Sequence, residues 1–230
     1  MKSKKNQNYP VITIDGASGT GKGVVTHRIA KELNWNLLDS GALYRVLALA
    51  AEKYHISLDN APALTKAADQ LDVQFITNEL GIPPRIILER EDVTDIIRSE
   101  QIGNAASKVG ALPAVREALL DRQRAFLQYP GLVTDGRDMG TVIFPEANLK
   151  VFLIASPNIR AERRYNQLKA IGIHVNLDAL VSELSERDKR DSERLHAPLK
   201  PAANALCIDT DFLTIQEVVN QIMTEAKKFL

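Results

Sequence analysis

The stretch that decides the fold is Gly16-Ala17-Ser18-Gly19-Thr20-Gly21-Lys22-Gly23. It follows a short apolar run, Val11 to Asp15, and opens a helical pattern that reaches about Leu33. The Gly-x4-Gly-Lys spacing lets the backbone wrap around an anion, so that several N–H groups and a helix N-terminus point at one phosphate chain. Lys22 adds a positive charge where β- and γ-phosphates would lie. Because a strand precedes this stretch and a helix follows it, we predict a nucleotide-phosphate loop rather than a plain glycine-rich turn.

The position after the lysine departs from the common form of this loop. A Ser or Thr usually stands there and holds magnesium directly, whereas this chain has Gly23 followed by Val24. A metal would therefore be held through water and by a carboxylate elsewhere. Neither the guanine-reading Asn-Lys-x-Asp pattern nor the Asp-x-x-Gly switch of GTPases occurs in the 230 residues. The loop thus indicates a small-molecule kinase.

The composition is that of one globular unit with a local anion site. Apolar residues make up 45% of the chain, and Lys plus Arg equals Asp plus Glu at 29 each, so no overall field favours nucleic acid or an anionic membrane. No apolar run approaches the roughly 20 residues of a membrane span. Cys207 is the only cysteine, which is consistent with a reducing cytoplasm, and we expect it to be a small buried residue in a strand. No nucleic-acid, membrane or obligatory protein partner is expected, and a monomer is the default.

Apolar strands alternate with helical patterns along most of the chain. The predicted strands cover residues 11–15, 36–39, 132–135, 149–154 and 205–209, and the predicted helices include 21–33, 42–54 and 113–128. Near-continuous apolar strands that alternate with helices predict an α/β fold, a parallel sheet with helices on both faces.

The stretch 67–108 breaks this rhythm. Two short strand patterns, 73–77 and 85–88, flank a turn-rich segment that contains Gly81 and Pro83-Pro84. We therefore predict an inserted antiparallel subdomain at 67–108, a core formed by 10–66 and 109–230, and a flexible tail at 1–9.

Polar residues gather where the predicted strands end. In parallel sheets ligands bind beyond the carboxyl ends of the strands. The segments that fall there are Asp39-Ser40-Gly41, Asp135-Gly136-Arg137-Asp138, Ser156 and Asp209-Thr210. We expect them on the same edge of the sheet as the phosphate loop. Asp135 ends an apolar run, which suits a carboxylate that holds magnesium through water; a strand-end position need not bury it uncharged, and capping of the next turn is the alternative.

Arginines at this edge are candidates for phosphate contact, because planar guanidinium groups make bidentate bonds to phosphate. Arg187, Arg190, Asp191 and Arg194 follow helical spacing, so they share one face that either looks into a cleft or forms a solvated surface. The same two interpretations, a lid over a nucleotide triphosphate or an exposed surface, apply to Arg160, Arg163 and Arg164. No histidine has a nucleophile or metal-ligand spacing nearby. Many arginines and few candidate bases suit an acceptor that is itself a phosphate, whose oxygen is already ionised.

Several blocks resemble the bacterial cytidylate kinase family over nearly the whole chain from about Pro10. They are the loop 16–23, Leu38-Asp39-Ser40-Gly41-Ala42-Leu43-Tyr44-Arg45, Asn104-Ala105-Ala106-Ser107, Val115-Arg116-Glu117-Ala118-Leu119-Leu120, Asp135-Gly136-Arg137-Asp138-Met139-Gly140-Thr141-Val142 and the stretch from Glu186-Arg187-Asp188 to Arg194. The resemblance implies a five-stranded parallel sheet of the P-loop kinase type, an enlarged monophosphate-binding insert and a short lid at about 157–175. It implies a cytoplasmic enzyme that transfers the γ-phosphate of ATP to CMP or dCMP with Mg.

The resemblance also implies roles for residues at matching positions. ATP would be bound by Gly16, Ala17, Ser18, Gly19, Thr20, Gly21, Lys22, Gly23, Val24 and Arg163. The acceptor phosphate would be surrounded by Ser40, Tyr44, Arg45 and Arg137. The cytosine would be read by Ser107, Arg116 and Asp138. The ribose would be held by Arg187 and Asp191, with Arg194 contributing from the same helix. Lys22, Arg137, Arg187 and Asp135 would be catalytic, with Asp135 also holding the Mg shell. Two positions depart from the family, which often has Pro at Ala17 and Thr at Val24; the second departure removes a hydroxyl that would touch phosphate.

Two other readings remain open from the residues alone. The chain could phosphorylate another nucleoside monophosphate or a shikimate-like hydroxyl. It could also be a nucleotide-binding regulator without turnover, although the complete set of arginines argues against that.

Overall fold

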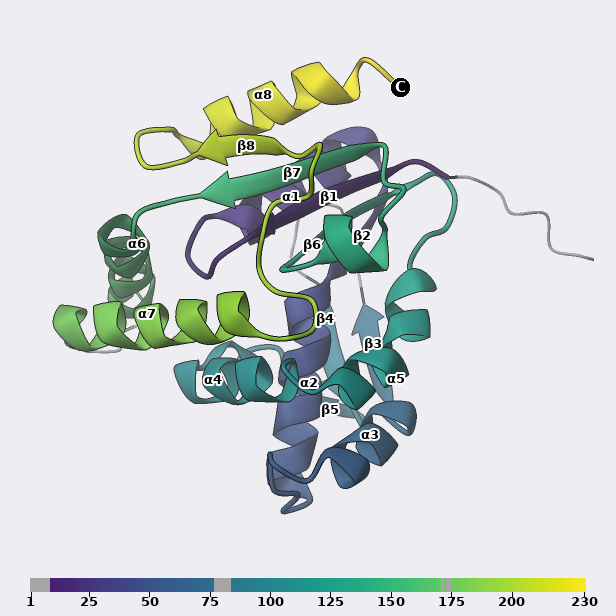
Figure 1. The fold of residues 1–230 in the computed structure, drawn as a ribbon, viewed down its shortest axis with the longest axis vertical. Helices are drawn as coiled ribbons and strands as arrows, with labels where there is room; N and C mark the ends of the chain where they lie inside the picture. The colour runs from purple at the N-terminus through teal and green to yellow at the C-terminus, as the bar shows by residue number, and fades with distance from the viewer. Residues whose placement is uncertain (1–8, 77–83, 171, 173–174) are drawn as a thin grey trace, which may run out of the picture.

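A computed structural model describes residues 9–76, 84–170, 172 and 175–230. Its main sheet is parallel and five-stranded (Figure 1), with the order β2 (Asn36–Asp39), β6 (Leu132–Gly136), β1 (Val11–Gly16), β7 (Leu149–Ile154) and β8 (Leu206–Asp209). The register places Asp39 beside Asp135, and Asp15 beside Gly136. The predicted α/β fold and all five of its strands are therefore confirmed, and the acidic strand ends lie next to one another.

Helices cover both faces of this sheet. On one face α1 (Lys22–Leu33) and α8 (Ile215–Ala226) pack on strands β1, β6, β7 and β8 through an apolar cluster that includes Ile14, Ile29 and Ile222. The opposite face is covered by the start of α2 (Ser40–Lys53) and by a π-helical turn, η2 (Met139–Ile143), where Leu43 and Met139 pack against Leu132. Both faces of the central strands are thus removed from water, which explains their continuous apolar sequence.

A second group of elements has its own core. It contains the rest of α2, α3 (Ala61–Asp69), the antiparallel sheet β3 (Val73–Ile76), β4 (Arg85–Leu88) and β5 (Glu91–Asp92), the short 3-10 helix η1 (Ile96–Arg98), α4 (Glu100–Val109) and α5 (Pro113–Arg124). The buried cluster of this group runs from Ala42 to Leu119, a wider stretch than the predicted insertion at 67–108. The predicted antiparallel strands are present, whereas Gly81 and Pro83 of the predicted turn lie outside the described residues.

Two further helices close the side of the molecule beyond α4. Helices α6 (Pro157–Ala170) and α7 (Leu177–Glu193) pack together through a small cluster of their own that includes Leu168 and Leu184. Helix α6 occupies most of the predicted lid; residues 171, 173 and 174 of that stretch, and residues 1–8 of the predicted tail, lie outside the described residues. Within the described part of the chain, no helix is long and apolar enough to cross a membrane.

Two local predictions are wrong. Helix α5 ends at Arg124 rather than near Gln128, because the chain turns there and brings Phe126 against Phe75 with ring centroids 5.6 Å apart. Cys207 is exposed rather than buried. Its strand, β8, is the edge strand, and only alternate residues such as Ile208 face the helix-covered side.

Candidate active site

The phosphate loop connects β1 to α1 and has the backbone shape that its glycines permit. Gly21, the N-cap of α1, has φ 90°, which L side chains rarely adopt. Gly19 has φ 82°, and a Cβ atom there would lie 2.9 Å from Cβ of Arg160. Nothing in the protein lies within 4 Å of a Cβ added at Gly23, so this departure from the common motif leaves open space. The loop therefore ends with the free N–H groups of a twelve-residue helix.

The lysine of the loop is folded back onto it. Lys22 Nζ donates to the carbonyl oxygen of Ala17 at 2.8 Å, and the same oxygen accepts from Thr20 Oγ1 at 3.0 Å. Burial, with the nearby Arg137 as the next cause, lowers the pKa of Lys22 to about 7. A phosphate in the loop would supply the missing counter-charge, so binding an anion and protonating Lys22 favour each other.

Three aspartates end neighbouring strands beside this loop. The register places the side chains of Asp39 and Asp135 on one face of the sheet, and Asp15 on the other. The expectation that Asp135 need not be buried uncharged is wrong, since its residue is only 5% exposed and burial, with Asp39 next, raises its pKa to about 8. Its Oδ1 has no hydrogen-bond partner among the described residues. A buried carboxylate with a free oxygen beside a second carboxylate suits a hard cation such as Mg²⁺, which takes oxygen ligands and keeps several waters.

Asp15 has a different structural role, hydrogen bonding to backbone N–H groups, which was not predicted from the sequence. Its two carboxylate oxygens accept from the backbone N–H groups of Met139 at 2.9 Å and Gly140 at 2.8 Å. These are the first N–H groups of the π-helical turn that follows Asp138. Burial raises the pKa of Asp15 to about 6, with the two backbone bonds acting in the opposite direction. The residue that precedes the phosphate loop thus also fixes the backbone that carries Asp138.

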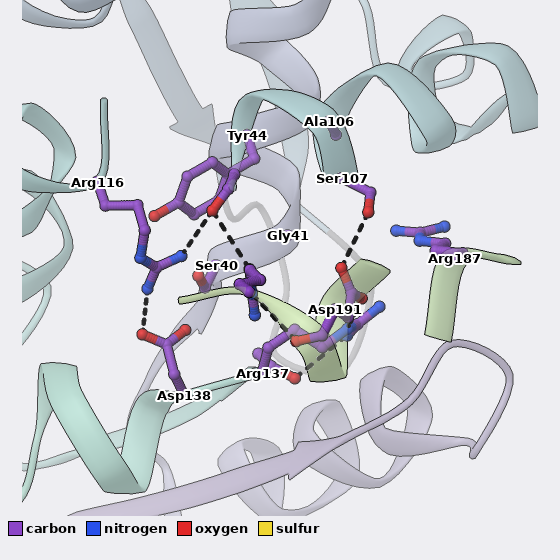
Figure 2. A pocket seen from close by; sticks show the side chains of 13 residues that line it. Ser40, Gly41, Tyr44, Ala106, Ser107, Arg116, Arg137, Asp138, Arg187 and Asp191 are labelled. Carbon is purple, nitrogen blue, oxygen red and sulfur yellow. Dashed lines mark hydrogen bonds and ion pairs between the residues drawn. The ribbon is translucent and has the colours of Figure 1, made fainter. Parts of the chain in front are cut away.

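A second pocket opens on the side of β6 away from β1 and lies between α2, α4, α5 and α7 (Figure 2). It is lined by Ser40, Gly41, Tyr44, Ala106, Ser107, Gly110, Arg116, Gly136, Arg137, Asp138, Arg187, Asp191 and Arg194. Nine of the ten predicted substrate-binding residues are in this set, although they come from five separate parts of the sequence. Arg45 is the exception.

Charged pairs organise the pocket (Figure 2). Arg116 forms a buried ion pair with Asp138 and lies over the ring of Tyr44, with its Cζ 5.7 Å from the ring centroid. On the other side, Asp191 accepts from Ser107 Oγ at 2.9 Å and from Arg137 Nε at 2.9 Å. One wall thus presents an Arg and a carboxylate that could read the edge of a base, and the other presents hydroxyl, carboxylate and guanidinium groups.

Cations outnumber their counter-charges between the pocket and the phosphate loop. Arg187 is 8% exposed, its Nε has no partner among the described residues, and burial, with Arg137 next, lowers its pKa to about 9. Burial also lowers the pKa of Arg194. The pKa of Asp191 falls instead, because Arg137, Arg194 and Arg187 outweigh the effect of its burial. Buried guanidinium groups that weaken one another's protonation call for an anion, and a phosphate group has the required charge and geometry.

Arg45 lies on the far side of Arg187. Its Nη1 donates to the carbonyl oxygens of Ile97 at 2.6 Å and Ser99 at 3.2 Å. A Cβ at Gly103 would lie within 3.2 Å of both the Arg45 and Arg187 guanidinium groups, so this glycine of α4 lets them approach each other. Arg45 lines a neighbouring cleft of about 460 Å³ together with Val24, which is 49% exposed. Both residues border the space between the loop and the second group of elements.

The three arginines of α6 separate into distinct roles. Arg160 is buried and donates to the phosphate-loop carbonyl of Ser18 at 3.0 Å, so it supports the loop from outside. Arg163 donates to the hydroxyl and carbonyl oxygens of Thr210 beyond β8. Arg164 pairs with Glu100 at the start of α4. The support given by Arg160 was missed, because the three arginines look alike in the sequence. Gln123 was missed as well; it accepts from Ser40 Oγ at 2.8 Å.

The comparisons with known proteins identify the family. The family model described as cytidylate kinase matches residues 12–228. The chain belongs to the cytidylate kinase family. A cytidylate kinase from Azotobacter vinelandii (strain DJ / ATCC BAA-1303) is 60% identical over 215 residues, 94% of each chain. A second, from Shewanella denitrificans (strain OS217 / ATCC BAA-1090 / DSM 15013), is 55% identical over 222 residues, 96% of this chain and 98% of its own. Among solved structures, a gluconokinase from Sinorhizobium meliloti 1021 aligns with 95% of this chain and 92% of its own, at 16% identity and a TM-score of 0.47.

Membership of the cytidylate kinase family confirms the resemblance seen in the sequence, and it covers both the phosphate loop and the second pocket. The matched residues include Ala17 and Val24, the two departures from the usual pattern. The roles of individual site residues rest on the geometry described above.

Proposed function

We propose that this protein transfers the γ-phosphoryl group of ATP to CMP or dCMP and releases ADP with CDP or dCDP. The observation that carries the proposal is the pairing of two sites at one edge of the sheet: a phosphate loop and a pocket with unbalanced buried arginines and the base-reading pair Arg116 and Asp138. Family membership supports the same activity.

In this proposal the acceptor lies in the second pocket. Cytosine has a 4-amino donor where uracil has a carbonyl acceptor, so the buried carboxylate of Asp138 favours cytosine. Arg116 supplies donors for the ring acceptors, and Ser107 supports the same edge. The arginines Arg137, Arg187 and Arg194, with Arg45 behind them, neutralise the acceptor phosphate, and Asp191 holds the ribose side.

The donor phosphates lie in the loop of residues 16–24. Lys22 moves from the Ala17 carbonyl to the β- and γ-phosphates, and the N–H groups of α1 hold the chain. An oxygen of the acceptor phosphate attacks the γ-phosphorus, the bond between that phosphorus and the β–γ bridging oxygen breaks, and ADP leaves with the electron pair. No general base is needed because the attacking oxygen is already ionised. Lys22, Arg137 and Arg187 stabilise the charge that spreads over the transferred group.

Asp135, with Asp39 beside it, would hold Mg²⁺ through water near these phosphates. When bound, the ion supplies charge neutralisation at the β- and γ-phosphate oxygens. The proposal includes a working monomer that needs no protein partner. The lone cysteine and the nucleotide substrates favour the cytoplasm as its compartment.

An acceptor screen tests this function. ADP release would be coupled to an absorbance readout with Mg-ATP and CMP, dCMP, UMP, AMP or shikimate as acceptor. We expect CMP and dCMP to be the best acceptors. Activity chiefly on UMP, AMP or shikimate would overturn the acceptor, and ATP binding without any acceptor-stimulated ADP release would indicate a regulator instead of an enzyme.

A further inference from the structure

Gln123 is a fully buried amide (0% exposed) near the end of α5. The buried stripe of this helix consists of Val115, Arg116, Leu119 and Gln123. An apolar residue would fill the last position without the loss of hydration that a buried amide brings. Arg116 in the same stripe pairs with Asp138 in the acceptor pocket. Gln123 thus lies on the same side of the helix as the base-reading arginine, about two turns further along.

Two hydrogen bonds fix which end of the Gln123 amide faces the pocket. Its nitrogen donates to the carbonyl oxygen of Leu119, one turn earlier in α5, at 3.3 Å. A carbonyl oxygen can only accept, so the NH₂ group must point there and the amide oxygen must point the other way. That oxygen accepts from Ser40 Oγ at 2.8 Å. Turning the amide over would set two acceptor oxygens against each other.

The hydroxyl of Ser40 therefore has a fixed polarity. A serine hydroxyl has a single proton and two lone pairs. Since the amide oxygen of Gln123 can only accept, the proton of Ser40 is used in that bond. The lone pairs of Oγ are left for the pocket that Ser40 lines (Figure 2). The pocket thus offers a hydrogen-bond acceptor at Ser40.

An acceptor at this point can select among nucleotides. The oxygens of a phosphate group are themselves acceptors, so this polarity does not suit the phosphate contact that the resemblance implied for Ser40. An exocyclic amino group is a donor, whereas a carbonyl in the same position is an acceptor, so the arrangement favours cytosine over uracil. Ser40 also rests on α5, the helix that carries Arg116, which places it at the base-reading wall.

We infer that Gln123 is a positioning residue for base selection, which holds the Ser40 hydroxyl as an acceptor for an amino-bearing base. The inference rests on the proposed function, which puts a cytosine nucleotide in this pocket. It adds a residue that acts from outside the pocket lining.

The first test is Gln123→Met, which keeps the length of the side chain but removes both amide groups. The Ser40 hydroxyl can then turn its proton into the pocket. We expect the ratio of kcat/KM for CMP to that for UMP to fall about fivefold or more, with the Kd for ATP changed less than about twofold. Gln128→Met is the matched control, because Gln128 is exposed and its amide also donates to a backbone carbonyl, that of Ala125 at 3.2 Å. An unchanged CMP/UMP ratio in Gln123→Met would overturn the inference, even if that variant loses thermal stability.

A conservative variant, Gln123→Glu, should restore selection. Burial favours the neutral carboxyl group, which has a donor for Leu119 and an acceptor for Ser40, as the amide has. We expect its CMP/UMP ratio to lie within about twofold of the parent's, because the polarity of Ser40 is kept. A Gln123→Glu variant as unselective as Gln123→Met would contradict control of Ser40 by the amide.

A double-mutant cycle separates positioning from packing. Ser40→Ala removes the hydroxyl through which Gln123 acts, so adding Gln123→Met to Ser40→Ala should change the CMP/UMP ratio less than about twofold. A further loss as large as in the parent background would contradict the inference. Calorimetric titration of each variant with CMP and UMP repeats the cycle without turnover. A parent that binds UMP as well as CMP would overturn the proposed function and this inference together, whereas a selective parent with an unchanged ratio in Gln123→Met would overturn this inference alone.

Discussion

Arg137 donates from Nε to Oδ2 of Asp191 at 2.9 Å and so joins the end of β6 to helix α7. The side chain of Asp191 is buried (4% exposed) and that of Arg137 is largely covered (17% exposed), so water hydrates neither charge well. Asp191 also accepts from Ser107 of α4, so this carboxylate links three walls of the acceptor pocket, formed by β6, α4 and α7. Removing it leaves a buried guanidinium without its partner.

We therefore expect Asp191→Asn to lower kcat/KM for CMP by at least tenfold and to leave the Kd for ATP within twofold. The loss follows from misplaced Arg137 and from the missing acceptor of Ser107. Steady-state kinetics and ATP titration measure the two quantities. Asp178→Asn, an exposed carboxylate in the first turn of the same helix, is the matched control. An equal effect of both variants would contradict the role of Asp191.

Asp138→Ala should reduce CMP phosphorylation by at least tenfold, far more than it weakens ATP binding. The variant removes the acceptor for the cytosine amino group and the ion-pair partner of Arg116. Discrimination between CMP and UMP should narrow at the same time, because the carboxylate no longer repels the uracil carbonyl. Asp121→Ala, exposed on α5, should change neither quantity. If CMP phosphorylation and ATP binding fall together, Asp138 is not a base reader.

Asp15→Asn should loosen the turn after Asp138 while it leaves that carboxylate in place. The amide keeps one acceptor oxygen but sets an NH₂ donor against a backbone N–H of Met139 or Gly140, a loss of about 1–3 kcal/mol in the free energy of unfolding. We expect KM for CMP to rise and CMP/UMP discrimination to fall. Asp209→Asn, an exposed strand-end aspartate of β8, is the control. A variant that only loses thermal stability, with discrimination intact, would show that Asp15 does not position Asp138.

The raised pKa of Asp135 predicts a pH dependence of stability in nucleotide-free protein with chelator. The folded chain holds this proton up to about pH 8, whereas the unfolded chain releases it near the ordinary value of 3.8. The contribution is fully present below pH 3.8 and is lost as pH rises through 8. In denaturant unfolding, the free energy of unfolding of Asp135→Asn minus that of the parent should therefore increase as pH rises from 5 to 8. Mg-ATP should reduce this increase. A difference that decreases with pH in the absence of ligand would contradict the raised pKa of Asp135.

The two loop glycines around Lys22 should respond in opposite ways to alanine. Gly21 has φ 90°, so Gly21→Ala should cost about 1–3 kcal/mol of strain and weaken ATP binding. Gly23 has open space and lies in the first turn of α1, so Gly23→Ala should keep or raise the free energy of unfolding, by up to about 1 kcal/mol. Thermal and denaturant unfolding of the pair would measure this. Equal destabilisation by both would show that the loop conformation differs from the one described.

The sequence was most informative where local chemistry decides the structure. The loop 16–23 and the polar residues after each apolar strand predicted the carboxyl-end edge, because parallel strands bring their ends together whatever else the chain does. Prediction was weaker where distant contacts decide. The different roles of Arg160, Arg163 and Arg164 depend on which segment each side chain contacts. The two hydrogen bonds that Asp15 accepts from the backbone of η2 join parts of the chain at least 124 positions apart.

Burial was the other quantity that the residue pattern did not predict. Asp135 ends a strand, yet α1 and its loop cover it, and Cys207 lies within an apolar run that forms an uncovered sheet edge. Both outcomes follow from the order of strands in the sheet, which places β6 inside and β8 outside. The local periodicity of apolar residues does not determine the order of the strands.

The separate core of the second group of elements, running from Ala42 to Leu119, has an evolutionary consequence. The donor machinery rests on the cluster of α1, α8 and the strands, which includes none of those residues. Substitutions that reshape the acceptor wall can therefore be absorbed by one core while the other keeps its packing. Proteins that share the phosphate loop can therefore evolve to bind new acceptors while the packing that supports triphosphate binding stays the same.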